Sequence, residues 1–271
     1  MNTCAIVITY KNPEMLARCM DSLRGQCETL IVDNSEHNRL YTEAINDGIR
    51  TLLTPVWVDS PAAYLQGVRG HLDPPDHILI CCDDVIVRPG TVAALEKCLD
   101  ENPKAAIAMP LQVGTGGKVN CGGCIAAWPV GTHISEPLGS PLYANGPYET
   151  YWANGACFLL RASAVRECGL LDENMRFICS DSDYSFTLRS RGWKILVAPD
   201  AHVEHEARGA LQTDNAWLER IKQEDMLFFM RKWMTGGLFQ ELSAEGRSLR
   251  PADIQSRLHY LTQAIALTPK G

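Results

Sequence analysis

The 271-residue chain has little that would tie it to a membrane or to nucleic acid. No apolar run approaches the roughly 18 to 20 residues of a membrane-spanning helix. Positive charge is also scarce, because 25 lysine and arginine residues face 32 aspartate and glutamate residues, which leaves a net charge of -7. Broad electrostatic binding to nucleic acid or anionic lipid is therefore not expected. An anionic ligand would need a local binding site.

The start of the chain has neither a basic segment nor a cleavage site before its first apolar run. We therefore expect a cytoplasmic protein without a transmembrane anchor. With 46% hydrophobic and 21% charged residues, the composition is that of an ordinary globular protein. A chain of this length can bury a hydrophobic core without disulfides.

The cysteines do not form the pattern of a disulfide framework or of a structural zinc site. There are eleven, an odd number, and most lie in apolar segments, so we expect reduced thiols. Cys121 and Cys124 have zinc-ligand spacing, but neither a second cysteine pair nor a histidine pair follows at the required interval. The glycine-rich residues 114–118 lack the serine or threonine of a phosphate loop, because Val119 occupies that position, and we expect a turn there.

The first third of the chain predicts alternating strands and helices. Residues 4–10 form a β-rich apolar run, and Asn12 and Pro13 then provide a helix cap and first turn. Residues 30–32 and 77–82 predict two further strands, and a β-α-β beginning implies parallel pairing with right-handed crossovers. The other expected elements are strands at 105–109, 152–160 and 194–197 and helices at 91–99, 163–168, 184–191, 213–233 and from 251, with loops and hairpins across 111–150.

These elements predict an α/β protein with a mostly parallel central sheet flanked by helices. We expect a catalytic domain over residues 1–210, divided into a nucleotide-binding half at 1–110 and an acceptor half at 111–210. Residues 211–271 would form a helical C-terminal extension. Its apolar stripe is typical of core packing or of a homodimer contact.

Acids and histidines gather where predicted strands end. In open α/β sheets, ligands bind beyond the carboxyl ends of the strands. Adjacent Asp83 and Asp84 would repel one another unless a cation or a basic group relieved them, and hard divalent ions such as Mg²⁺ and Mn²⁺ prefer carboxylate oxygens. A helix cap or exposed turn is the alternative for this pair. The complete set at predicted strand ends is Asp33, Asp83, Asp84, Asp181, Asp183, His202 and His205.

Residues 5–208 resemble the family 2 nucleotide-sugar glycosyltransferases, which have the GT-A fold, and especially their bacterial rhamnosyltransferase-like members. The resemblance is carried by several segments in the family's order. These segments are residues 6–12, 30–35, 82–85, 152–161, 169–173, 180–183, 191–193 and 199–205. Each is weak alone, and together they are specific.

The resemblance implies a metal-dependent inverting glycosyltransferase that moves a sugar from a nucleotide diphosphate donor to an acceptor hydroxyl. Asp181 matches the general base, and Asp84 and His205 match the ligands of a Mn²⁺ or Mg²⁺ ion. The donor nucleotide and sugar would contact Thr9, Tyr10, Asp33, Asp83, Asn154 and Gly155. Because Asp33 would accept a hydrogen bond from a uracil or thymine ring, UDP or TDP donors are favoured, and GDP donors remain open. The acceptor could be a glycan, a natural product or another hydroxyl compound.

Two residues depart from the family pattern. Cys82 stands where the D-x-D motif has its first acid, and Ser180 stands where a glutamate often precedes the base. A soft thiol is a poor Mg²⁺ ligand, so Cys82 is left out of the metal site. These departures keep a non-catalytic nucleotide-sugar-binding protein open as an alternative. A nucleotidyltransferase-like enzyme is the other, although residues 9–13 lack its glycine-rich phosphate loop.

Overall fold

The computed structural model describes residues 2–35, 40–53, 64–65, 74–114, 117–125, 132–205 and 216–234, with isolated positions at 259 and 262–263. The break at Gly236 and Gly237 lies outside the described residues, as does nearly all of the helix expected from residue 251. Within the described part of the chain, no helix combines the length and apolar character needed to cross a membrane.

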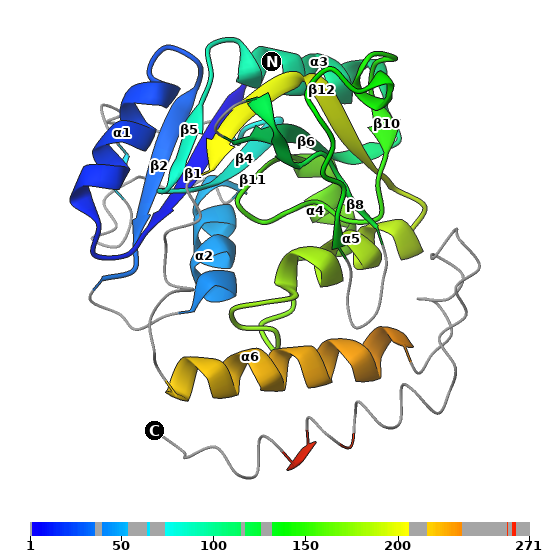
Figure 1. Cartoon of the computed structure of the whole chain (residues 1–271). Helices are drawn as coiled ribbons and strands as arrows, with labels where there is room; N and C mark the ends of the chain where they lie inside the picture. The colour runs from blue at the N-terminus through cyan, green and yellow to red at the C-terminus, as the bar shows by residue number, and fades with distance from the viewer. Residues whose placement is uncertain are drawn as a thin grey trace.

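The described residues form a mixed α/β structure around one large sheet (Figure 1). Its strands run in the order β10-β12-β6-β11-β4-β1-β2-β3, with β5 paired to β12 and β7 paired to β6. The strands are β1 (Thr3–Thr9), β2 (Glu28–Asp33), β3 (Tyr64–Leu65), β4 (His77–Cys82), β5 (Val85–Val87), β6 (Ala105–Val113), β7 (Val119–Cys121), β10 (Tyr148–Glu149), β11 (Cys157–Arg161) and β12 (Lys194–His205). A separate hairpin pairs β8 (Cys124–Ile125) with β9 (Thr132–His133).

The centre of the sheet is mostly parallel, as expected. Strand β1 pairs in parallel with both β2 and β4, and β6 pairs in parallel with β12. Strand β11 lies antiparallel between β4 and β6. Because of this reversal, the residues just before β11 lie at the same edge of the sheet as the carboxyl end of β4.

Helices cover both faces of the sheet and create two cores (Figure 1). Ile6 and Ile8 of β1 point into one core, and Ala5 and Val7 point into the other, as the period of two in a strand requires. The helices are α1 (Pro13–Leu23), α2 (Tyr41–Leu53), α3 (Thr91–Glu101), α4 (Ala162–Cys168), α5 (Ser180–Ser190) and α6 (Ala216–Phe229), with a π-helical turn at Met230–Met234 and a 3₁₀ turn at Pro141–Tyr143. Helices α1 and α3 pack on one face, and α2, α4, α5 and α6 contribute to the core on the other.

Local sequence signals place the first helix correctly. The Asn12 side chain accepts a hydrogen bond from the backbone N–H of Met15, and Pro13 is the first residue of α1. Gly25 follows the helix with a φ of 76°, a left-handed conformation that glycine adopts without a Cβ clash. Close packing rather than backbone conformation explains Gly48 of α2, because a Cβ there would lie 2.7 Å from Ile6 Cγ2.

Several expected elements have different boundaries: β6 and β12 run to Val113 and His205 instead of ending at 109 and 197, and two further differences affect the residues at the sheet edge. The strand expected from residue 152 begins only at Cys157, because Asn154 and Gly155 form polar contacts across the sheet edge instead of pairing in a ladder. The helix expected from residue 184 begins at Ser180, so both acids of this segment lie inside its first turn.

Candidate active site

The carboxyl ends of three parallel strands and the loop before β11 meet at one edge of the sheet. Thr9 ends β1, Asp33 ends β2 and Cys82 ends β4. Cys157 pairs with Cys81, which brings the preceding Gly155 to this edge. The fold therefore collects residues from four distant parts of the sequence.

Asp83 and Asp84 point to different partners, which separates two acids that are adjacent in sequence. Asp83 Oδ2 accepts hydrogen bonds from Thr9 Oγ1 at 2.7 Å and from the Tyr10 backbone N–H at 3.4 Å. Burial raises the pKa of the Asp83 carboxyl, and the Thr9 hydrogen bond opposes this effect. Asp83 therefore fixes the turn after β1, where Tyr10 is 46% exposed.

Asp84 faces His205. Their Oδ2 and Nε2 atoms are 3.4 Å apart, and the Asp84 residue is only 7% exposed. Strand pairing explains the contact, because His205 of β12 lies opposite Val85, the residue after Asp84. The structure thus brings Asp84 and His205 together, and their role as metal ligands stays a prediction.

A buried amide orients His205. His205 Nδ1 lies 3.2 Å from Gln112 Oε1, an atom that can only accept a hydrogen bond. Nδ1 therefore carries the proton, and in the neutral ring Nε2 presents a lone pair towards Asp84. A carboxylate oxygen and an imidazole nitrogen at this distance attract each other when a proton or a metal ion lies between them, and the oxygen and nitrogen donors suit a divalent ion.

The same amide network reaches the loop before β11. Gln112 Nε2 donates to Asn154 Oδ1 at 2.7 Å, and this oxygen also accepts the backbone N–H of Ala156 at 3.0 Å. The Asn154 amide nitrogen then lies 3.1 Å from His133 Nε2. Asn154 is therefore held in one orientation between the Asp84–His205 pair and the β8–β9 hairpin.

Asp181 lies against Gly155. Its Oδ2 accepts the Gly155 backbone N–H at 2.8 Å, and its Oδ1 accepts the Ser182 N–H at 2.7 Å in the first turn of α5. A side chain at Gly155 would be crowded, since a Cβ there would lie 3.1 Å from Tyr41 Oη and 3.2 Å from Asp181 Oδ2, which would have to move by a few tenths of an ångström. Desolvation raises the pKa of the Asp181 carboxyl, and the two N–H donors oppose that shift.

Asp183 makes contacts that stabilise the fold, although it is only two residues from Asp181. It is 1% exposed, and its Oδ1 accepts the Trp233 indole N–H at 2.6 Å and lies 2.8 Å from Lys232 Nζ. Desolvation raises its pKa, and the Lys232 ammonium opposes this shift. Asp183 therefore joins α5 to the turn after α6 and does not face the strand ends.

The C-terminal helix also secures the segment that leads into α5. Asp225 of α6 is fully buried, and its Oδ2 accepts the backbone N–H groups of Phe177 at 2.7 Å and Ile178 at 3.0 Å. The apolar residues Phe229 and Trp233 pack into the core, whereas Trp217 remains 40% exposed. Helix α6 therefore contributes to the support of Asp181, and the homodimer contact expected of this region stays a prediction.

Of the remaining predicted residues, Asp33 is open to a ligand, whereas His202 is turned away from the site. Asp33 is exposed at the end of β2, and its Oδ1 accepts the Ser35 N–H at 2.8 Å, so the carboxylate is open to a ligand. His202, by contrast, turns a ring nitrogen to the Pro199 carbonyl at 2.8 Å and does not join His205. Cys82 Sγ lies 3.8 Å from Tyr41 Oη, and burial raises the pKa of this thiol, so Cys82 is a neutral packing residue.

Sequence reasoning missed Gln112, His133 and Tyr41. Gln112 has a detectable signal, because it is a polar residue that is buried near the end of an otherwise apolar strand. Tyr41 donates its hydroxyl to the Gly155 carbonyl oxygen, and His133 reaches Asn154 from a short hairpin. Neither of these contacts has a signal in local sequence spacing.

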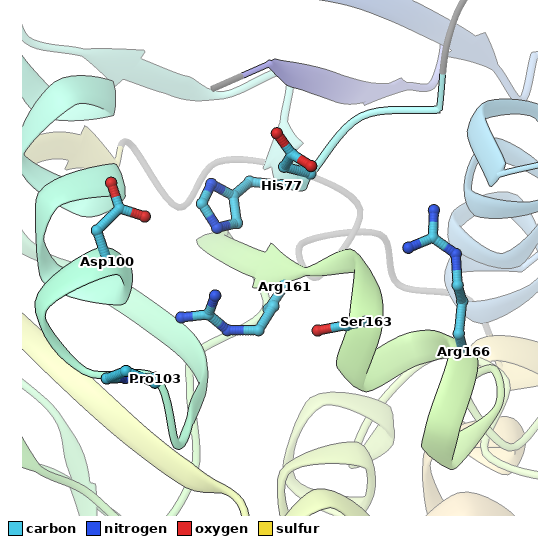
Figure 2. Close-up of a pocket in the computed structure, with 7 residues that line it drawn as sticks. His77, Asp100, Pro103, Arg161, Ser163 and Arg166 are labelled. Atoms are coloured by element: carbon cyan, nitrogen blue, oxygen red, sulfur yellow. The ribbon is translucent and has the colours of Figure 1, made fainter.

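A pocket elsewhere on the molecule does not contain any of these groups. This cavity has a volume of about 430 Å³. Figure 2 shows the residues that line it, which are Asp76, His77, Asp100, Pro103, Arg161, Ser163 and Arg166. His77 begins β4 and Arg161 ends β11, so the cavity lies at the opposite end of these strands from Cys82 and Gly155. We therefore place the candidate active site at the strand-end acids.

Comparison with solved structures identifies the class of protein that has this fold. The structure superposes on GalNAc-T7 with UDP, GalNAc and Mn²⁺ with a TM-score of 0.62 and 13% identity, covering 97% of this chain and 54% of that one. It also matches S. aureus TarS 1-349 in complex with UDP-GlcNAc, with a TM-score of 0.55, 11% identity and coverage of 99% and 74%. The fold is that of the GT-A glycosyltransferases. The chain spans about half the length of the GalNAc-T7 chain.

Sequence comparison gives the family. A family model described as "Glycosyltransferase like family 2" matches residues 2–225, and the chain therefore belongs to glycosyltransferase family 2. A curated relative from Mycobacterium tuberculosis, N-acetylglucosaminyl-diphospho-decaprenol L-rhamnosyltransferase, is 24% identical over 240 residues, with 78% of each chain covered. The expected fold and enzyme class, glycosyltransferase, are confirmed.

Proposed function

We propose that this protein transfers a sugar from a nucleoside diphosphate donor to an acceptor hydroxyl, with inversion at the anomeric carbon. One observation carries the proposal. The Asn154–Gly155 loop connects a candidate base, Asp181, with a candidate metal site, Asp84 and His205, through a continuous set of hydrogen bonds. These groups are the two kinds that the reaction needs, a proton acceptor and a stabiliser of diphosphate charge.

The donor nucleotide would lie beyond the ends of β1 and β2. Tyr10 is exposed there, and Asp33 presents a carboxylate that can accept the ring N–H of uracil or thymine. Asp83 holds the turn that carries Tyr10 through the Thr9 hydroxyl. This arrangement favours UDP or TDP donors.

Asp84 and His205 would hold Mn²⁺ or Mg²⁺. A bound divalent ion would neutralise the diphosphate as the bond to the sugar breaks. Gln112 keeps the His205 lone pair directed at Asp84, which preorganises the ligand set. Cys82 supplies no ligand, because its neutral thiol packs against Tyr41.

Asp181 would take the proton of the acceptor hydroxyl. Two backbone N–H groups hold both of its oxygens, so its orientation is fixed before substrate binds. A carboxyl whose pKa is raised towards the working pH is a more effective general base than an ordinary aspartate. A single attack from the face opposite the leaving diphosphate inverts the anomeric centre.

The sugar and acceptor follow less directly from the residues. The mycobacterial relative is named as a transferase of L-rhamnose to a lipid-linked N-acetylglucosamine, and we include both groups in the proposal for this chain. L-rhamnose on TDP or UDP is therefore the first donor to test. A polyprenyl diphosphate N-acetylglucosamine is the first acceptor.

The test is a thermal-shift panel of UDP, TDP and GDP sugars with and without Mn²⁺. At one hundred times its Kd, a ligand of the native state adds about 2.7 kcal/mol of stability. For a protein of this size, this corresponds to a rise in Tm of roughly 5 to 11 °C. We expect Mn²⁺-dependent stabilisation, seen as a rise in Tm, with the sugars of one nucleotide class. The Asp84→Asn variant should lose this rise in Tm. Asp100→Asn, which changes an acid at the remote cavity, should keep it.

Turnover separates the proposal from the alternative of a binding protein. Release of nucleoside diphosphate from the donor that gave the shift should require both Mn²⁺ and Asp181. A donor-dependent shift without release or transfer with any acceptor would favour the binding protein. The absence of any shift across the panel would refute the proposed donor site.

A further inference from the structure

The β8–β9 hairpin assembles a second group of metal-binding side chains. Cys121, Cys124 and His133 each offer a ligand atom, and these atoms all lie within 4.8 Å of one another. Cys124 and His133 are paired residues of the hairpin, and Cys121 ends β7 just before it. Among the described residues, no other group of at least three histidine, cysteine or acidic side chains is this compact.

The spacing of the two thiols matches a tetrahedral metal site. Cys121 Sγ and Cys124 Sγ are 3.7 Å apart. Two thiolates bound at about 2.3 Å to a tetrahedral Zn²⁺ ion lie about 3.8 Å apart, so these sulfurs already have nearly the required separation. A disulfide would need a separation of about 2.05 Å, and therefore a movement of the backbone or side chains.

The surroundings suit a soft ion. Cys121 and Cys124 are 1% and 0% exposed, so an ion bound to their sulfurs would be shielded from solvent on that side. His133 is the exposed member of the three, so its imidazole is accessible to an ion from solvent.

We propose that Cys121, Cys124 and His133 bind one thiophilic divalent cation of the Zn²⁺ class, with a fourth position open to water or another ligand. Each thiol releases its proton as its sulfur binds the ion, so binding releases two protons. Thiolate and imidazole select Zn²⁺, whereas the oxygen-rich site at Asp84 suits Mg²⁺ or Mn²⁺. The chain would thus bind two chemically different ions.

The ion would secure the hairpin next to the candidate active site. His133 contacts Asn154, which in turn contacts Gln112. Fixing His133 to Cys121 and Cys124 would therefore limit movement of the hairpin against the Asn154–Gly155 loop. Local sequence reasoning argues against this site because it looks for a second pair of ligands at fixed spacing, whereas strand pairing supplies His133.

The direct test is titration of the reduced, metal-free full-length protein with Cd²⁺. Bound thiolate gives a sulfur-to-cadmium charge-transfer absorption that a carboxylate site does not produce. We expect this absorption to saturate at one ion per chain and to lose at least half of its intensity in Cys121→Ser and in Cys124→Ser, because each variant keeps only one of the two thiols. Loss of a supporting hydrogen bond to a ligand weakens metal affinity by about 10- to 100-fold, so His133→Gln, which removes a ligand, should weaken it at least tenfold.

The matched control is a second buried thiol pair. Cys19 Sγ and Cys81 Sγ are 3.9 Å apart in the core between the sheet and α1, and no histidine belongs to this pair. Cys19→Ser should therefore keep the cadmium absorption and its one-to-one stoichiometry. Asp84→Asn should also keep it, which makes the result independent of the proposed catalytic metal.

Three results would overturn the proposal. The first is an absence of charge-transfer absorption in the reduced wild-type protein, and the second is an equal absorption in Cys121→Ser. The third is an isolated protein whose mass lacks two hydrogens until a reductant restores them, with the linkage mapped to Cys121 and Cys124. That result would identify the pair as a disulfide.

Discussion

Asp181 and Asp183 lie two residues apart on α5, and neutralising each should have opposite consequences. Asp181 contacts the Gly155 loop, whereas Asp183 contacts Lys232 and Trp233. Replacement by asparagine changes charge with almost no change in size. We expect Asp181→Asn to lose turnover and keep stability, and Asp183→Asn to lose stability and keep turnover.

The magnitude for Asp181→Asn follows from its proposed role. A positioned general base contributes about 10²- to 10⁴-fold to the rate, which corresponds to roughly 3 to 5 kcal/mol of barrier. An asparagine oxygen can still accept one of the two backbone N–H groups, but the amide nitrogen then faces the other, and an unsatisfied buried donor costs about 1 to 3 kcal/mol. Relief of the desolvated charge offsets part of this cost. The Tm should therefore change by only a few degrees.

The magnitude for Asp183→Asn follows from its two charge-assisted contacts, at 2.6 Å and 2.8 Å. Charged hydrogen bonds exceed neutral ones by about 1 kcal/mol each. Because desolvation raises the pKa of the Asp183 carboxyl, its neutralisation recovers part of this loss. In this variant Lys232 also retains its ion pair with Asp172, whose Oδ2 lies 3.0 Å from Lys232 Nζ. We expect a net loss of about 1 to 2 kcal/mol, or roughly 2 to 8 °C in Tm.

The assay measures kcat and Tm of both variants with the donor identified by the thermal-shift panel. Donor binding to Asp181→Asn should stay within a few-fold of wild type, because the proposed nucleotide site is elsewhere. If Asp183→Asn lost turnover while folded and Asp181→Asn kept it, the assignment of the base would be wrong. Equal losses of turnover and stability in both variants would show that α5 acts only as a structural element.

Further predictions concern pH, packing and the metal. Since desolvation raises the pKa of Asp181 above 3.8, kcat should decline with acidification at a pH above that value. Because the pKa of the Asp181 carboxyl is higher in the folded than in the unfolded protein, the wild-type protein loses stability as the pH rises from 3.8 to the folded-state pKa. Asp181→Asn lacks this titration, so its Tm relative to wild type should increase with pH over that interval. Gly48→Ala forces a Cβ to 2.7 Å from Ile6 Cγ2 and should cost about 1 to 3 kcal/mol in urea unfolding, whereas Gly139→Ala, with nothing within 4 Å, should be nearly neutral. Gln112→Ala should raise the Mn²⁺ concentration needed for donor binding by about 10- to 100-fold, and an unchanged requirement would contradict its role in orienting His205.

The identity and order of the first strands and of α1 could be read from the sequence, whereas α2 (Tyr41–Leu53) was not expected. Residues 4–10 and 77–82 have the continuous apolar character of strands that are buried on both faces, and Asn12 and Pro13 mark a helix start. The first and last residues of these elements were harder to predict from the sequence. Asn154 and Gly155 look like part of a strand, but their polar groups bind Gln112 and Asp181 across the sheet edge, and this interaction delays the strand to Cys157.

The sequence alone therefore determined the α/β order, the acids at the strand ends and the resemblance to family 2, because these depend on local periodicity and on motifs in sequence. The resemblance already favoured Asp181 over Asp183 and His205 over His202. Only the tertiary structure supplies the physical reason, since helix phase and strand pairing decide which side chain faces the edge. It also brought His133 to Cys121 and Cys124. Contacts of this kind join residues far apart in the chain, and no local pattern encodes them.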